Sequence, residues 1–371
     1  MPKHRGLTLK KFIGAIPPHL FERYLDQLQT EGKPSGWALL HHKTLAAFLD
    51  DPQNAAVSPV ILEDFHRIND LCGHGMSLLV RAYRHAGLDI DQSRTAEELT
   101  MRLFLDHREA FECAWTLYLI YSNPSKLSVY RVPGPPIEVA GEHVERLQTD
   151  LASWFSGLAK GDACQVDWFV DGDETVIRIS RGSYLRTVAC WQGDQVTFMR
   201  FRPASEDVIV YNPRLSELVI KASLPKDRAQ YLTAFAASIA GDARLAEAAR
   251  AAPVFTLAPL QDGTFHFEGD GIVMGVSLIR VTVNLGDRCG TVMELKSDNI
   301  VETLRRPPFA GLSLAGVELV AASFRFQLQP EDAPPASVTF EIEPPARTNL
   351  TQKPYADIIE RYLTEQGVRL V

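Results

Sequence analysis

Cysteines are few and widely spaced in this sequence. They form no Cys-x-x-Cys pair, and their number is odd. Such a pattern is not typical of a disulfide framework or of a thiolate zinc site. Reduced thiols in a cytoplasmic protein are therefore the simplest interpretation of the five cysteines, which are Cys72, Cys113, Cys164, Cys190 and Cys289.

Long apolar runs are lacking as well. The longest, Cys113 to Tyr121, is far shorter than the ~20 residues that a membrane helix needs, so it predicts a buried helix segment. The first residues, MPKHRGLTLKKFIGAIPP, are basic but do not contain the apolar stretch of a secretory signal. We expect no membrane among the partners.

Basic residues are outnumbered by acidic ones. The 371 residues carry 38 Lys and Arg against 46 Asp and Glu, so the formal net charge is -8. Nucleic-acid binding by the chain as a whole is therefore excluded, and only a local basic patch could provide it. The composition, 46% hydrophobic and 23% charged, is that of a globular protein with two or three domains.

Familiar catalytic motifs are also missing. The sequence has no phosphate loop, no dinucleotide fingerprint after a strand, no nucleophile elbow and no His-Glu-x-x-His. Glu63 and His66 lie three residues apart at helical spacing, but a carboxylate-bridged metal pair needs a second such motif. We therefore expect no metal site here and no cofactor, and the prediction is a non-catalytic binding or assembly protein with a protein partner.

The apolar periodicity changes once along the chain, and this change predicts an α+β protein. Residues 1–130 show helical spacing, and a linker with a bridging helix follows over residues 131–160, beginning near the Pro-Gly-Pro-Pro sequence at 133–136. Short alternating runs then predict two sheet-plus-helix halves, at 161–250 and 251–371, with a C-terminal helix near residues 355–366.

The two halves end alike. VIVYNPRLSELVIKA precedes a predicted helix at 224–240, and SVTFEIEPPARTNL precedes YADIIERYL. A diverged duplication would explain this, and so would the general frequency of strand-then-helix endings. The same segments resemble uncharacterised bacterial proteins. That resemblance covers at most the C-terminal two-thirds of the chain and implies a bacterial protein, but no activity and no functional residues.

An alternative interpretation is a metal-dependent nuclease of the PD-(D/E)xK type. Glu294 and Lys296 would form its acid-x-Lys pair, on one face of a strand, with Asp287 or Asp270 as the second acid. Carboxylates would hold Mg²⁺ or Mn²⁺ there, and the lysine would stabilise developing charge. An ion pair at the edge of a sheet explains Glu294 and Lys296 equally well.

A stretch over residues 178–203 combines arginines with aromatic residues. Arginine neutralises phosphate and aromatic rings stack on exposed bases, so the composition is that of a single-strand-binding sheet face. A solvated face with its aromatics in the core is the other interpretation. The candidate nucleic-acid-binding residues are Arg178, Arg181, Tyr184, Arg186, Trp191, Arg200 and Arg202. If the stretch binds nucleic acid, Arg178, Arg186, Arg200 and Arg202 are expected to share the solvent-facing side of one sheet.

Overall fold

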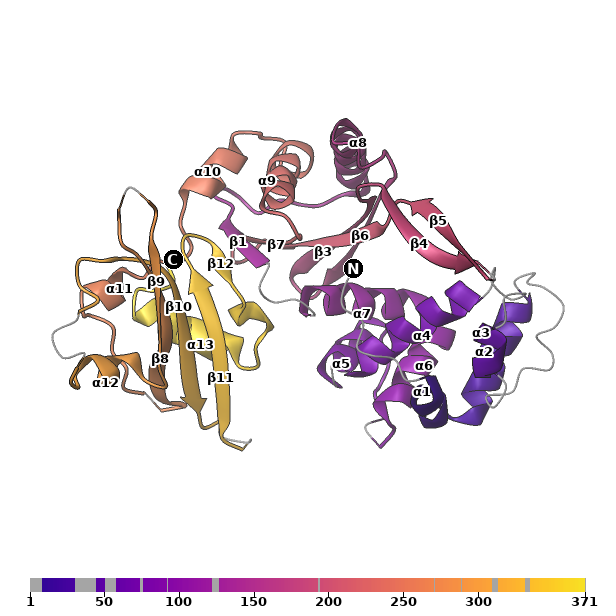
Figure 1. The fold of residues 1–371 in the computed structure, drawn as a ribbon, viewed down its shortest axis with the longest axis horizontal. Helices are drawn as coiled ribbons and strands as arrows, with labels where there is room; N and C mark the ends of the chain where they lie inside the picture. The colour runs from indigo at the N-terminus through magenta and orange to yellow at the C-terminus, as the bar shows by residue number, and fades with distance from the viewer. Residues whose placement is uncertain are drawn as a thin grey trace. The chain divides into compact units, whose positions relative to one another are not determined.

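The chain contains two compact units, Met1–Ser122 and Asn123–Val371. The computed structural model describes residues 9–30, 45–50, 58–73, 76–91, 93–121, 127–192, 194–269, 271–287, 289–308, 313–330 and 334–370. The first unit is helical, and the second is built on a large antiparallel sheet (Figure 1). The predicted α+β class is confirmed.

The first unit consists of helices in its described part. Thr95 is the N-cap of the helix that begins at Ala96, since its side chain accepts a hydrogen bond from the Glu98 amide at 3.2 Å. This helix ends at Asp106 and the next begins at Arg108, because the backbone of His107 between them is not helical. The helices are α1 (Leu9–Ala15), α2 (Pro18–Thr30), α3 (Leu45–Asp50), α4 (Ser58–Gly73), α5 (Met76–His85), α6 (Ala96–Asp106) and α7 (Arg108–Tyr121).

The second unit has one ten-stranded antiparallel sheet in the order β2-β3-β6-β7-β1-β12-β11-β10-β8-β9. A separate two-stranded sheet is formed by β4 (Arg186–Gln192) and β5 (Gln195–Phe201). The strands of the large sheet are β1 (Leu127–Arg131), β2 (Cys164–Asp171), β3 (Glu174–Gly182), β6 (Ala204–Asn212), β7 (Glu217–Lys221), β8 (Val273–Asn284), β9 (Val292–Lys296), β10 (Glu318–Leu328), β11 (Ala336–Glu343) and β12 (Arg347–Thr348).

Helices follow or precede the strands of each half. The predicted bridging helix within residues 131–160 and the predicted helices near residues 224–240 and 355–366 are confirmed, although the second of these three is an α-helix that continues as a π-helical turn. The helices of this unit are α8 (Gly141–Gly157), α9 (Pro225–Ala234), the π-helix η4 (Phe235–Ile239), α10 (Leu245–Ala251), α11 (Ala258–Gln261), α12 (Ile300–Leu304), the 3-10 turn η5 (Leu350–Gln352) and α13 (Ala356–Glu365).

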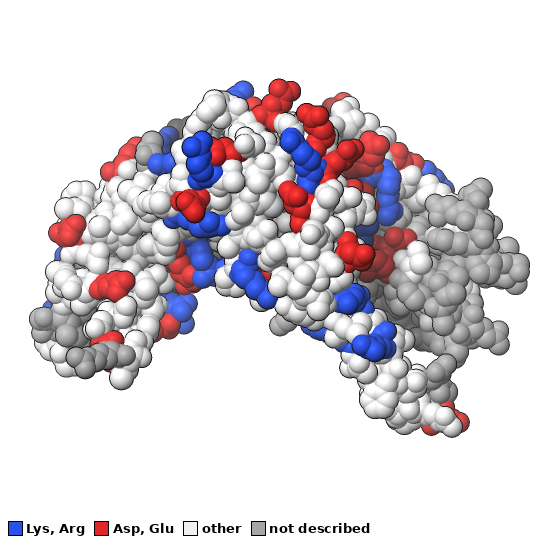
Figure 2. Space-filling view, turned by 90° about the horizontal axis from the view of Figure 1, so that it is seen from above, with Lys and Arg blue, Asp and Glu red and all other residues white. Residues whose placement is uncertain are grey.

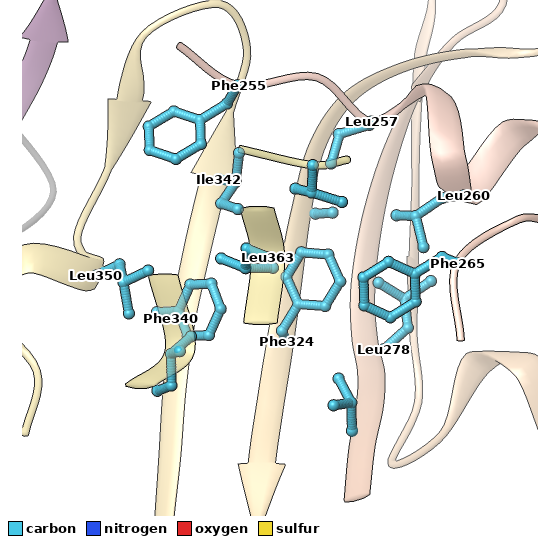
Figure 3. Packing of buried hydrophobic residues seen from close by; sticks show 14 of the residues in the cluster. Phe255, Leu257, Leu260, Phe265, Leu278, Phe324, Phe340, Ile342, Leu350 and Leu363 are labelled. Carbon is cyan, nitrogen blue, oxygen red and sulfur yellow. The ribbon is translucent and has the colours of Figure 1, made fainter. Parts of the chain in front are cut away.

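Each half of the sheet has its own hydrophobic core. In the first half, α8 buries Leu147, Leu151 and Phe155 against β3 and β6 residues such as Ile177 and Ile209. In the second half, aromatic side chains of β10 and β11 pack against α13 and the segment before β8, as Figure 3 shows for Phe324, Phe340, Phe265 and Leu363. The two predicted sheet-plus-helix halves are therefore present, but they share one sheet.

The halves meet at β1, a strand that the sequence analysis did not anticipate. It pairs with β7 over Leu127–Arg131 on one side and with β12 through Ser128 and Arg347 on the other. Without β1 the backbone edges of β7 and β12 would be unpaired in the middle of the sheet, at the cost of buried amides and carbonyls. The strand preceding the first half thus joins it to the second.

The two halves share part of their order of elements. The first half has the hairpin β2–β3, the hairpin β4–β5, the hairpin β6–β7 and then α9. In the second, Glu268 bridges Gly275 of β8, β8 pairs with β9, β10 pairs with β11, and α13 follows. In the first half β4 and β5 are detached from the large sheet, whereas each named strand of the second half lies within it.

We predict that residues Asn123–Val371 fold without the first unit, because this unit contains both cores of the sheet. The separately expressed fragment should unfold cooperatively on heating, with an aromatic circular-dichroism signal that disappears at the same temperature. The same measurement on full-length protein provides the reference. A fragment without a cooperative transition would show that the boundary at Ser122 is misplaced.

Candidate functional site

The detached hairpin exposes a large amount of apolar surface. We call the segment Tyr184–Arg202, which contains β4 and β5, the arm. Trp191 is 75% exposed and Phe198 is 72% exposed, although side chains of this kind are usually half-buried or more. The exposed large apolar side chains of the arm are Tyr184, Leu185, Val188, Trp191, Val196, Phe198, Met199 and Phe201.

Both faces of the arm are apolar. Residues paired across two antiparallel strands point to the same side, and neighbours along a strand point to opposite sides. One face carries Trp191 beside Val196 and Phe198 beside Ala189. The other carries the pairs Val188–Met199 and Arg186–Phe201. No described strand pairs with the outer edge of either β4 or β5.

The root of the arm is held against the end of α8. The Arg202 guanidinium donates to the carbonyl oxygens of Ala159 (2.7 Å) and Ser183 (3.2 Å), and the Ser183 amide donates to the Pro203 carbonyl (2.9 Å). A Cβ at Gly182 would lie 2.5 Å from the Lys160 carbonyl oxygen, so only glycine fits this approach. These contacts fix the position at which the two strands of the arm leave the rest of the second unit.

Next to this root lies a cluster of four buried charges. The Lys160 ammonium donates to both carboxylate oxygens of Asp227 at 2.9 Å. Arg181 bridges the two acids, with its guanidinium 2.7 Å from Asp227 and 2.8 Å from Asp207. The Tyr231 hydroxyl also donates to Asp207, at 2.7 Å. The cluster joins the end of α8, β3, β6 and the first turn of α9, and it is electrically neutral.

Burial and pairing act in opposite directions on these groups. Burial opposes the charge of Arg181, but Asp207, Tyr231 and Asp227 outweigh it, so the pKa of the guanidinium is raised. Burial raises the pKa of Asp207, and the bonds from Arg181 and Tyr231 counteract that rise. Three rings lie around the Lys160 ammonium, with centroids 5.3 to 5.5 Å away; they belong to Phe155, Trp154 and Tyr184.

Removing one charge of the cluster should destabilise the protein strongly. Asp227→Asn leaves Lys160 and Arg181 with one carboxylate between them, and we expect a loss of ~3–5 kcal/mol in the free energy of unfolding, measured by urea denaturation. The matched control is Asp173→Asn, which breaks an exposed pair with Arg214 and should change stability by about 0.5 kcal/mol or less. Equal losses in the two variants would contradict the role of the cluster.

The structure separates the candidate nucleic-acid-binding residues into three groups. Arg181 was expected on a surface, but it lies in the core because it pairs with two buried aspartates. Arg178 belongs to the ten-stranded sheet and pairs with Asp167 at 3.0 Å. The expected common sheet face is therefore wrong.

The remaining candidates lie on or beside the arm. Arg186 and Arg200 are exposed on opposite faces of it, and neither forms an ion pair with any described residue. Trp191, near the tip of the arm, is its most exposed apolar residue. Tyr184 and Arg202 instead form hydrogen bonds at the root of the arm. The aromatics of β4 and β5 are not core residues, which the sequence had left open.

Two of the candidate nuclease residues that the structure describes, Asp287 and Glu294, are engaged in other local contacts. Glu294 and Lys296 do share a face of β9, but Glu294 pairs with Arg280 at 2.7 Å, and the same arginine lies 3.6 Å from Glu341. Asp287 accepts a hydrogen bond from the Thr291 amide, at 2.6 Å, in its own turn; bonds from the Thr291 hydroxyl and amide lower its pKa. Asp270 lies outside the described residues.

Metal ligands do not cluster in the described residues. No group of three or more His, Cys, Asp or Glu side chains there could hold an ion. Among the helices of the same residues, none is long and apolar enough to cross a membrane. Near β9, Glu294 is instead engaged with Arg280 and Asp298 with Arg325.

We expect no metal-dependent cleavage of nucleic acid, because Arg280 already neutralises Glu294. Plasmid and single-stranded DNA incubated with the protein and Mg²⁺ or Mn²⁺ should remain intact on a gel. Cleavage that disappears in both Glu294→Ala and Lys296→Ala would instead establish the nuclease.

Comparison with known proteins adds no function. The sequence matches no family model and no curated protein.

Sequence reasoning missed the partners of Arg181. Lys160, Asp207, Asp227 and Tyr231 were not singled out. One signal was available, since alternation along DVIVYN places Asp207 on the same strand face as the core residues Ile209 and Tyr211. An aspartate on the core-facing side of a strand predicts a buried cation as its partner.

Proposed function

We propose that this chain is a non-catalytic binding protein of the bacterial cytoplasm that docks another protein through the arm. The observation that carries the proposal is the exposure of eight large apolar side chains on a detached hairpin. No described group of side chains forms a metal site, and no motif of a common enzyme is present. Binding is the function that this arrangement supports best.

The exposed apolar area of the arm is that of an interface. The eight side chains, about half exposed, leave on the order of 800 Å² of accessible surface over the two faces of the arm together, or on the order of 400 Å² on each face. Monomeric proteins seldom expose apolar patches larger than a few hundred Å². A two-stranded hairpin is also only marginally stable by itself in water. Contact with a partner would cover this surface and stabilise the hairpin.

A second candidate function is binding of single-stranded nucleic acid. It is favoured by the exposure of Arg186, Arg200 and Trp191 on the same arm. The charge of the chain disfavours it, because the protein as a whole carries -8. On the side where α8, α9 and α10 lie, acidic and basic side chains are interspersed and form no basic field (Figure 2). We therefore place a protein partner first.

We expect a specific protein of the native host to bind the arm of the wild type. It should not bind the double variant Trp191→Ser/Phe198→Ser. The two serines remove the most exposed aromatic rings, which are the residue types that dominate interface energies. Affinity purification of both proteins at equal loading, with quantitative mass spectrometry, measures the difference.

The control is Leu215→Ser/Met274→Ser, which removes two similarly exposed apolar side chains outside the arm (58% and 64% exposed). It should retain the partner. If the same proteins co-purify with all three, the proposal is contradicted. Binding of a single-stranded oligonucleotide that weakens steeply with salt and with Arg186→Ala/Arg200→Ala would favour the second candidate.

A further inference from the structure

We infer that Arg228 binds a carboxylate group at the place where α9 meets the central strands of the large sheet. This site lies outside the arm, so the inference and the proposed function can fail independently. Three observations support it. The guanidinium is buried without an acid of its own, one of its edges is open, and the charges around it leave one positive charge unbalanced.

Arg228 is a buried cation with a single hydrogen bond. The residue is 6% exposed, and its Nη1 group donates to the Ala222 carbonyl oxygen at 2.9 Å. No described carboxylate forms an ion pair with it. Burying a charge is costly unless the charge is paired. Arg181 meets this requirement with two aspartates, whereas Arg228 does not.

The free edge of this guanidinium has the geometry of a carboxylate fork. The Nε and Nη2 groups point to the same side of the planar group, and neither donates to a described residue. Both nitrogens retain some accessible surface, so a ligand can reach them from solvent. Two parallel N–H groups on one edge are the arrangement through which arginine binds both oxygens of a carboxylate.

The neighbours of Arg228 belong to strands at the centre of the sheet. Arg347 of β12 lies opposite Ser128 of β1. Tyr130 follows Ser128 by two residues along β1, so its side chain lies on the same face. Burial lowers the pKa of Arg228, and the nearby charge of Arg347 lowers it further, while Tyr130 acts in the opposite direction. The side chain thus reaches from the first half of the sheet to the strands where the halves meet.

The charge of this region decides between two classes of anion. Arg347 forms an ion pair with Glu343. Asp207 is held by Arg181. Both acids oppose the lowering of the pKa of Arg228 without cancelling it, so one positive charge remains. A carboxylate balances that charge. A phosphate monoester carries roughly -1.5 to -2 at neutral pH and would add excess negative charge beside Glu343.

Thermal unfolding of the full-length protein in sodium acetate tests the inference. Acetate at about tenfold excess over its dissociation constant should raise the midpoint by about 2–4 °C, compared with sodium chloride at equal ionic strength, because the site exists only in the folded protein. N-acetylglycine carries the same group as the end of a peptide and should also bind. Tighter binding of N-acetylglycine than of acetate would identify a peptide end as the ligand, and equal binding would identify a free acid.

Two variants locate the site. Arg228→Lys keeps the charge but has no fork, so acetate should bind it about tenfold more weakly. The matched control is Arg214→Lys, which changes an exposed arginine paired with Asp173 and should bind acetate like the wild type. Should Arg228→Lys fail to fold, the wild type alone still tests the site: acetate should shift one arginine Nε–H signal in the NMR spectrum.

Three results would overturn the inference. One is a midpoint that rises equally in the wild type, Arg228→Lys and Arg214→Lys, since an effect of acetate on all three is non-specific. Another is tighter binding of inorganic phosphate than of acetate, which would indicate a general cationic patch. The last is an NMR titration in which no arginine Nε–H signal moves.

Discussion

The pairing of Arg181 with Asp207 and Asp227 is the interaction on which the position of the arm depends. Ionised groups are expensive to bury, and each of these is tolerated only while its counter-charge stays within hydrogen-bonding distance. Arg181 directly precedes the glycine from which the arm departs, and Asp207 follows shortly after the chain returns. Any displacement of the root would separate buried charges. The strands can therefore leave the body in one direction only.

The same cluster also fixes the helices of the first half. Asp227 lies in the first turn of α9, where a negative charge is favoured by the helix dipole, and Lys160 follows the end of α8. The hydrophobic contacts of Phe155 and Tyr231 surround it. Non-directional packing supplies most of the stability, while the charges determine how helices and strands are aligned. Hydrophobic packing thus provides the stability of this region, and the ion pairs provide its alignment.

Much of this fold follows from periodicity in the sequence. Alternating apolar runs predict the strands of both halves and helical apolar spacing predicts the helices α8, α9 and α13, because one face of each is buried. The detachment of β4 and β5 could not be predicted in this way, since a strand that faces solvent on both sides and one that faces a core can have the same apolar content. β1 was missed because five residues before a Pro-Gly cluster carry little signal, and its partners are remote in sequence. The position of Arg181 depends on acids that lie 26 and 46 residues further along, which no local motif reports.

The central place of β1 has a consequence for how the protein is made. This strand is synthesised before every other strand of the sheet, yet one of its two neighbours, β12, ends at Thr348. During translation β1 can pair with β7 long before β12 leaves the ribosome, so the growing sheet has an open edge in its middle while the second half is being synthesised. Contacts between such distant segments form slowly, and unpaired edges attract other chains. While the second half is being synthesised, β1 is therefore at the edge of the sheet. In the finished protein it lies in the middle of the sheet.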